Sequence, residues 1–148
     1  MGSFEILPHT ADVGFRAFAP SLTDLFETAA RAMFSIEYDL SSVDVEEERP
    51  VEARTDDPAD AGGLLEAWLS ELLWLHDATG FVPGTVTVRA VGPVPDGGGS
   101  MQVEGSAGGR LIGDWFEQTG PQIKAVTLHG LDVHQEGDRW EATVYLDV

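Results

Sequence analysis

Hydrophobic and polar residues alternate with a period of two along several stretches of the chain, which is the pattern of strands with one buried face. The stretches that this pattern predicts as strands are 4–7, 13–18, 43–55, 85–91, 101–106, 111–116, 123–133 and 139–148. Pro50 predicts an interruption or a bend of the third strand, because proline cannot donate to a central ladder. Gly108 and Gly109 separate the predicted strands 101–106 and 111–116. Gly137 lies in a hairpin connection before the predicted strand 139–148.

Two further stretches carry apolar residues at the i, i+3, i+4 spacing of amphipathic helices. The first opens at Ser21, a predicted N-cap with an acidic residue three positions later, and fades near Tyr38. The second carries its apolar residues from Leu64 onward and is expected to stop at Gly80. The pattern therefore predicts one α+β domain over residues 1–148, with two amphipathic helices packed on a mostly antiparallel sheet of about six or seven strands.

The composition limits the classes of protein to consider. At 148 residues the chain is long enough for one domain with a hydrophobic core, and it lacks the run of about eighteen apolar residues that a membrane-spanning helix needs. Cysteine is absent, which excludes disulfides, thiolate metal sites and cysteine nucleophiles. No secretory signal is visible at the N-terminus, so we expect a cytoplasmic protein with no membrane partner.

The charge is strongly negative, with 26 acidic residues against 8 basic ones and a formal net charge of −18. Such a surface repels phosphate backbones, so direct and stable binding of nucleic acid is not expected. The charge fits a cationic protein partner, divalent cations, or solubility alone. Lys124 is the only lysine of the chain, which distinguishes it from the other basic residues.

Residues 9–14 place an imidazole, a hydroxyl and a carboxylate within four positions, between the first two predicted strands. Asp12 thus lies at the mouth of a strand, where its carboxylate can reach solvent or an ion. An equally weighted interpretation is that Asp12 only accepts a turn hydrogen bond from nearby backbone. His76, in the last turn of the second helix, is interpreted as a favourable charge near the helix dipole in preference to a ligand.

The C-terminal residues Asp147 and Val148 continue the pattern of the last strand. The apolar side chain of Val148 would be buried, which would hold the α-carboxylate in place beside Asp147. Two adjacent carboxylates repel each other unless a cation or a basic side chain lies between them. With Asp12 from another strand they would form an all-oxygen site suited to a hard divalent ion; Ca²⁺ tolerates such irregular shells, and Mg²⁺ is the more demanding alternative.

Several motifs occur in order along essentially the whole chain: 9–17 (HTADVGFRA), 21–26 (SLTDLF), 68–77 (WLSELLWLHD), 124–130 (KAVTLHG) and 146–148 (LDV). Together they resemble the motifs of the archease family. The chain departs from the family in three respects: Leu128 stands where a tyrosine is frequent, residues 114–122 lack a histidine that commonly precedes the lysine, and the loop around 97–99 is longer.

The resemblance implies a small α+β cytosolic protein that assists RtcB-type RNA ligases in tRNA splicing or RNA repair. Family members are not ligases; they promote guanylylation of the ligase's active-site histidine and support multiple turnover. They bind a divalent ion, generally calcium, and the ligands match Asp12, Asp147 and Val148 here. Lys124 falls on the lysine associated with ligase activation, and we expect His9 and His129, within matching motifs, to contact the partner.

Two other classes of function stay open from the residues alone. The first is a stand-alone metal-dependent phosphoesterase, with His9 as the base and with Asp12 and Asp147 as metal ligands. The second is a protein-binding module in which the ion only clamps the C-terminus. A phosphoesterase would act alone, whereas an accessory protein would do nothing without its ligase.

Overall fold

The computed structural model describes residues 2–7, 12–95 and 98–148. Within these residues it contains two α-helices, one short 3-10 helix and seven strands. In chain order they are β1 (Ser3–Leu7), β2 (Val13–Ala19), α1 (Leu22–Glu37), η1 (Leu40–Ser42), β3 (Glu47–Thr55), α2 (Ala61–Thr79), β4 (Phe81–Pro93), β5 (Met101–Leu111), β6 (Ala125–Glu136) and β7 (Arg139–Asp147). The predicted α+β class with two helices is confirmed.

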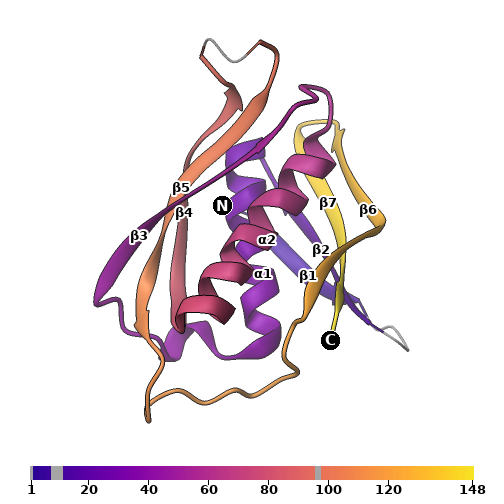
Figure 1. The fold of residues 1–148 in the computed structure, drawn as a ribbon. Coiled ribbons are helices and arrows are strands. Elements are labelled where there is room, and N and C mark those ends of the chain that lie inside the picture. The colour runs from indigo at the N-terminus through magenta and orange to yellow at the C-terminus, as the bar shows by residue number, and fades with distance from the viewer. Residues whose placement is uncertain (1, 8–11, 96–97) are drawn as a thin grey trace.

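The strands divide into two antiparallel sheets where the sequence pattern predicted one. The four-stranded sheet has the order β1-β2-β7-β6, and the three-stranded sheet has the order β3-β5-β4. Each helix contacts both sheets: α1 packs on β2 and β4, and α2 packs on β3 and β6 (Figure 1). The helices therefore join the two sheets through one common hydrophobic core.

Each helix begins and ends at residues that satisfy its free backbone groups. The Ser21 hydroxyl accepts a hydrogen bond from the Asp24 amide at the start of α1, as predicted. Asp60 caps α2 in the same way by accepting from the Gly63 amide at 2.8 Å, so this helix begins earlier than the apolar pattern indicated. Gly80 ends α2 with a φ of 74°, as expected of a C-terminal glycine.

The largest buried aromatic residues have their polar atoms satisfied. Trp68, on α2, is fully buried, and its indole N–H donates to the Phe26 carbonyl of α1 at 3.2 Å. The Tyr38 hydroxyl donates to the Pro83 carbonyl at 2.6 Å, and burial raises the pKa of this hydroxyl far above its usual range. Hydrogen bonds thus fix these rings in one arrangement within the core.

Of the interruption or bend predicted at Pro50, the interruption is wrong. Pro50 lies within the continuous strand β3, opposite Ser106 of β5. β3 is an edge strand, and an edge has one open side on which proline needs no donor. Residues 43–46, predicted as the start of this strand, lie between η1 and β3.

The predicted division into strands 101–106 and 111–116 is also wrong. β5 runs without a break from Met101 to Leu111, with Gly105 and Gly109 inside it. A Cβ at Gly109 would lie 2.0 Å from the Val82 carbonyl oxygen of β4, and a Cβ at Gly105 would lie equally close to the Thr87 carbonyl oxygen. The glycines thus permit close strand pairing, and do not form a turn.

The β6–β7 hairpin contains an irregularity that alternation alone did not predict. The two strands are in register from Ala125 to Thr127 and again from Asp132 to Glu136, with a bulge between. Gly130 lies in this bulge with a φ of 75°, in the left-handed region that favours glycine. The turn contains Gly137 with a φ of 61°, at the predicted position.

Replacing Gly109 by alanine is expected to destabilise the protein by about 3 kcal/mol or more, because the new Cβ meets strand backbone that cannot rotate away. Urea unfolding measures this change. Gly92→Ala is the matched control, since a Cβ at Gly92 has no neighbour within 4 Å, and it should change stability by about 0.5 kcal/mol or less. Equal effects of the two substitutions would contradict this account of β5.

Candidate functional site

Asp12 and Asp147 lie opposite each other at one end of the four-stranded sheet. Val13 is paired with Leu146 across β2 and β7, so the preceding residue, Asp12, lies across from Asp147. Oδ1 of Asp12 is shielded from solvent, whereas Asp147 is exposed. The sequence grouped these two residues only as a hypothesis; strand register sets them opposite each other on neighbouring strands.

The side chains of β7 alternate between the two faces of the sheet. Val144 and Leu146 are buried against the helices, and Val148, which continues their series, packs at the border of the core. Asp147 belongs to the opposite, outer face. The expected burial of the Val148 side chain is therefore partial, but it fixes the backbone next to Asp147.

Lys124 adjoins the same chain end through its backbone. Its amide donates to the Asp147 carbonyl at 2.8 Å, which extends the pairing of β6 and β7 by one residue. Its side chain lines a shallow hollow of about 370 Å³ on the helix side of the sheet, together with residues of α2. Lys124 thus shares a backbone contact with Asp147 but extends toward α2.

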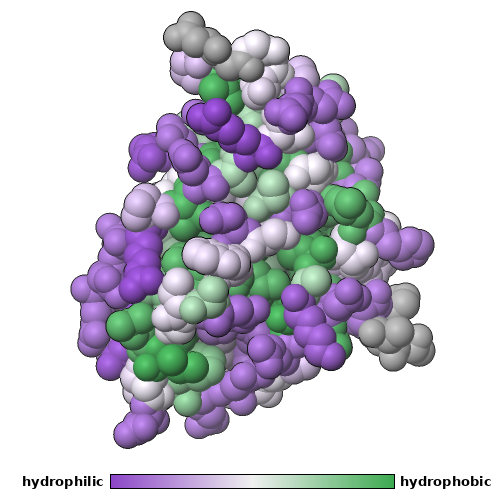
Figure 2. Space-filling model, viewed as in Figure 1, coloured by the Kyte–Doolittle hydropathy of each residue, from purple (hydrophilic) through white to green (hydrophobic). Residues whose placement is uncertain are grey.

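The hollow beside Lys124 combines an exposed aromatic ring with an exposed carboxyl group. The lining residues from α2 are Ser70, Leu73, Trp74, Asp77 and Ala78. Trp74 is 59% exposed, and burial is the main cause that raises the pKa of Asp77. Hydrophobic patches lie among hydrophilic residues on the face of the molecule that carries α2 (Figure 2). This face is therefore less uniformly acidic than the net charge suggests.

Tyr145 lies on the outer face between two glycines of the recognised motifs. A Cβ at Gly14 would lie 2.6 Å from the Tyr145 ring, and a Cβ at Gly130 would lie 2.9 Å from its other edge. Only glycine leaves room for the ring to lie flat against both neighbouring strands, two residues from Asp147. Sequence reasoning assigned no role to Tyr145, although its place between the two glycine motifs was a signal.

Of the two histidines predicted to contact the partner, the structure describes only His129. His129 lies in the bulge of β6, is exposed, and its amide donates to the Thr127 hydroxyl at 3.0 Å. The neighbouring Leu128 is 67% exposed, so the bulge presents an apolar side chain as well. His9 lies outside the described residues.

A buried carboxylate holds the segment that leads to Lys124. Glu37, at the end of α1, is 1% exposed, and its Oε2 accepts a hydrogen bond from the Ile123 amide at 2.7 Å. Its backbone carbonyl accepts hydrogen bonds from Thr119 and Gly120, at 2.9 and 3.0 Å. Residues 112–124, which lack regular structure, are thereby fixed at their far end, one residue before Lys124.

His76 faces Glu37 and forms an ion pair with it when protonated. Its Nε2 lies 3.1 Å from Glu37 Oε1, and its Nδ1 donates to the Phe81 carbonyl at 3.0 Å. Burial lowers the pKa of His76, but the contacts with Glu37 and Phe81 outweigh this effect and leave the pKa above its usual value. The dipole interpretation of His76 is therefore incomplete, because a specific carboxylate faces the ring.

Glu37 could have been found from the sequence. It follows Met33 by four positions and Phe34 by three, so it occupies the buried stripe of α1, where an acidic residue needs a partner. The rings of Phe34, Tyr38 and Phe116 surround His76 at centroid distances of 5.7 to 6.3 Å, which shields the ion pair.

Comparison with known proteins covers nearly the whole chain. Residues 4–148 match the family model described as the Archease protein family. This chain belongs to the archease family. A protein named archease from Methanothermobacter thermautotrophicus is 36% identical to it, and the match covers 100% of both chains. A protein named archease from Methanopyrus kandleri is 32% identical, and the match covers 98% of this chain and 99% of the relative.

Two solved structures have a similar fold. The solution structure of Methanobacterium thermoautotrophicum protein 1598 is 34% identical, with a TM-score of 0.80 and 98% of each chain covered. The crystal structure of an archease from Thermotoga maritima, described as a possible chaperone, is 19% identical, with a TM-score of 0.53 and coverage of 96% and 94%. The second likeness concerns the fold alone. In the part of our chain that the structure describes, no helix is long and apolar enough to cross a membrane.

The ion pair of His76 predicts a pH dependence of stability. Because the pKa of His76 is raised by folding, its contribution is fully present below about pH 6.5, the ordinary value, and is lost as the pH rises through the folded value. We expect His76→Gln to lower the free energy of unfolding most at pH 6 and less at pH 9, measured by urea unfolding. A difference between wild type and variant that does not change with pH would contradict this assignment.

Proposed function

We propose that this protein is an accessory protein of an RtcB-type RNA ligase, which promotes guanylylation of the ligase and its multiple turnover in tRNA splicing or RNA repair. Membership of the archease family supports this proposal over the full length of the chain. The observation that carries it is that strand register sets Asp12 across from Asp147, and that the Lys124 amide is hydrogen-bonded to the Asp147 carbonyl at the same end of the sheet. These residues would form the working end, and the protein would not itself be an enzyme.

The acidic end of the sheet fits a divalent metal ion, and we propose Ca²⁺. Asp12, Asp147 and Val148 would hold it, and they offer only oxygen donors, which hard cations prefer. The register of β2 and β7 supports the pairing of the two aspartates, and the Lys124 hydrogen bond steadies the end of β7. When bound, the ion would offset the repulsion between these carboxylates and fix the strand ends.

Lys124 and the hollow beside it would contact the ligase. Exposed tryptophans are enriched at protein interfaces because the ring supplies contact area, and the Lys124 amine would supply a charge beside it. The exposed bulge with Leu128 and His129 lies on the same sheet and would add to this surface. His9, in the same motif as Asp12, stays a further contact candidate.

The net charge of −18 is complementary to a partner with a basic groove. The same charge would repel the phosphate backbone of RNA, so we propose no direct contact with RNA. An acidic accessory protein would be steered to the groove in which a ligase holds its RNA, at a rate that falls with salt. It can then act only by favouring one state of the ligase over another, since it contributes no reaction of its own. We place this activity in the cytoplasm.

Lys124→Met is expected to slow guanylylation of a cognate ligase at least roughly tenfold, because it removes the single amine of the working end. Single-turnover assays with labelled GTP measure this step. Arg54→Met, which removes one exposed positive charge on the three-stranded sheet, is the matched control and should keep wild-type activity.

The same assays would distinguish the other classes of function. A wild-type protein that leaves guanylylation unchanged would exclude the accessory role for the ligase tested. Hydrolysis of a small phosphoester by the protein alone, lost in Asp12→Asn, would instead favour a phosphoesterase.

Calcium binding is tested separately from ligase activation. We expect Asp12→Asn and Asp147→Asn each to weaken Ca²⁺ binding by about tenfold or more, as measured by isothermal titration calorimetry. Asp56→Asn, which removes the same charge from an exposed loop, should bind as wild type does. Ligase activation that persists in variants unable to bind calcium would show that the ion is not needed at the working end.

A further inference from the structure

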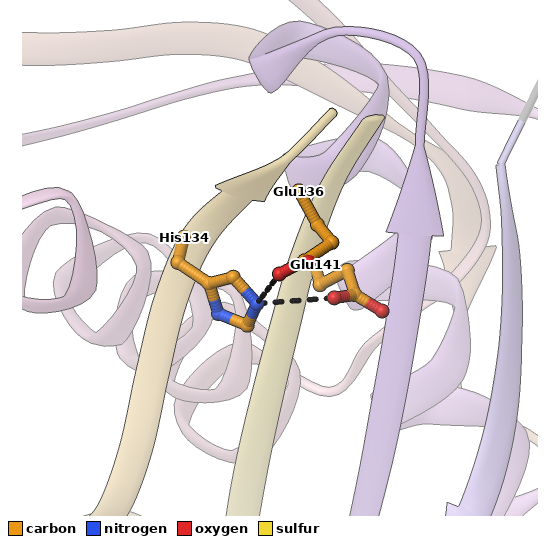
Figure 3. Close-up of side chains that lie close together, drawn as sticks. All are labelled: His134, Glu136 and Glu141. Atoms are coloured by element: carbon orange, nitrogen blue, oxygen red, sulfur yellow. Dashed lines mark hydrogen bonds and ion pairs between the residues drawn. The ribbon is translucent and has the colours of Figure 1, made fainter. Parts of the chain in front are cut away.

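A second group of metal-ligating side chains lies at the opposite end of the β6–β7 hairpin from Lys124 and Asp147. His134 and Glu136 occupy alternate positions of β6, so they share the outer face, and Glu141 of β7 is the direct cross-strand partner of His134. The three side chains point toward one another (Figure 3). Within the described part of the chain, this group of His and carboxylate side chains has its ligand atoms all within 4.8 Å of one another.

The distances within the group fit a small cation. Nε2 of His134 lies 3.0 Å from Oε2 of Glu141 and 3.5 Å from Oε2 of Glu136. Ligand atoms at the corners of a tetrahedral zinc site are separated by about 3.3 Å, given bond lengths near 2.0 Å. The two distances from His134 bracket this value, and all three ligand atoms lie within 4.8 Å of one another, so an ion could be bound once the side chains adjust.

Two neighbouring residues orient the ligand atoms. Asp132 accepts a hydrogen bond from Nδ1 of His134 at 2.5 Å, which leaves Nε2 to face the two glutamates. Arg139 donates to Oε1 of Glu141 at 3.0 Å, and its guanidinium lies over the Phe18 ring, 4.7 Å from the centroid. Oε1 of Glu141 is therefore occupied, and its Oε2 is turned toward the histidine.

This arrangement matches the way in which proteins hold metal-binding histidines. A carboxylate on the distal nitrogen fixes the tautomer and raises the basicity of the ligating nitrogen. With the Nδ1 proton given to Asp132, the lone pair of Nε2 would face two carboxylate oxygens. Only a proton on Nε2 or a bound cation makes that contact favourable.

We propose that His134, Glu136 and Glu141 form a binding site for a zinc ion, with water as the fourth ligand. An imidazole nitrogen beside carboxylates favours Zn²⁺ over Ca²⁺, which prefers an all-oxygen shell. The site is distinct from the proposed calcium site, because Glu141 precedes Asp147 by six residues, which is about 20 Å along a strand. Its ligands come from both β6 and β7, so a bound zinc ion would link the two strands near the turn of the hairpin, where β6 is the edge of the sheet.

The alternative occupant of the site is a proton. The hydrogen bond to Asp132 is the largest cause that raises the pKa of His134, and Glu141 adds to it. The charged groups that face the ring are Asp132, Glu136 and Glu141, with Arg139 behind the last. Zinc must displace this proton, so its binding should strengthen as the pH rises.

The test is a titration of the intact protein with zinc chloride, in excess calcium so that the all-oxygen site does not compete. Side-chain NMR follows the imidazole signals of the four histidines, which single substitutions assign. A competing fluorescent indicator gives the affinity. The variants are His134→Gln and Glu141→Gln, and Asp138→Asn in the same hairpin turn is the control that loses one acidic charge without losing a ligand.

We expect one zinc ion per chain to shift the His134 signals and to raise the melting temperature of the wild type. His134→Gln and Glu141→Gln should each bind zinc at least tenfold more weakly, and Asp138→Asn should bind as wild type does. Circular dichroism verifies that each variant is folded. The proposal is overturned if the His134 signals do not respond to zinc, or if His134→Gln binds zinc as tightly as the wild type.

Discussion

The buried ion pair between Glu37 and His76 is the interaction on which the arrangement of the chain end depends. A carboxylate 1% exposed is costly unless charge and hydrogen bonds compensate for the lost water, and both are supplied here. Glu37 ends α1, His76 lies in the last turn of α2, and Ile123 belongs to the segment that leads into β6. One side chain thus links both helices to a stretch without regular structure.

The strand β7 organises the outer half of the molecule. It lies between β2 and β6, so its inner residues belong to the core and its outer residues are shared with both neighbours. Asp147 at one end and Glu141 near the other carry the two groups of acidic side chains, and Tyr145 covers the glycines between them. The inner face is fixed by packing, which leaves the outer face available for ion binding.

Local sequence pattern predicted the helices and most strands, because amphipathic spacing and caps act over a few residues. It failed where long-range neighbours decide the outcome. Pro50 looks like a break until β3 is known to be an edge strand, and Gly109 looks like a turn until the carbonyls of β4 are seen beside it. Asp12 and Asp147 were grouped from their motifs, but the group around His134 could not be found, because its cross-strand pairing depends on the register of the hairpin.

The bulge in β6 changes which residues face outward. Before it, Thr127 opposes Tyr145, and after it Asp132 opposes Thr143, so β6 uses three more residues than β7 over the same distance. Side chains of a strand alternate between its two faces, so an odd number of extra residues exchanges the faces. Odd-numbered residues of β6 therefore face outward before the bulge, and even-numbered residues face outward after it. The bulge is thus a parity switch. If β6 kept all its residues but continued from Thr127 in regular register, position 134 would face the hydrophobic core and Val133 would face outward.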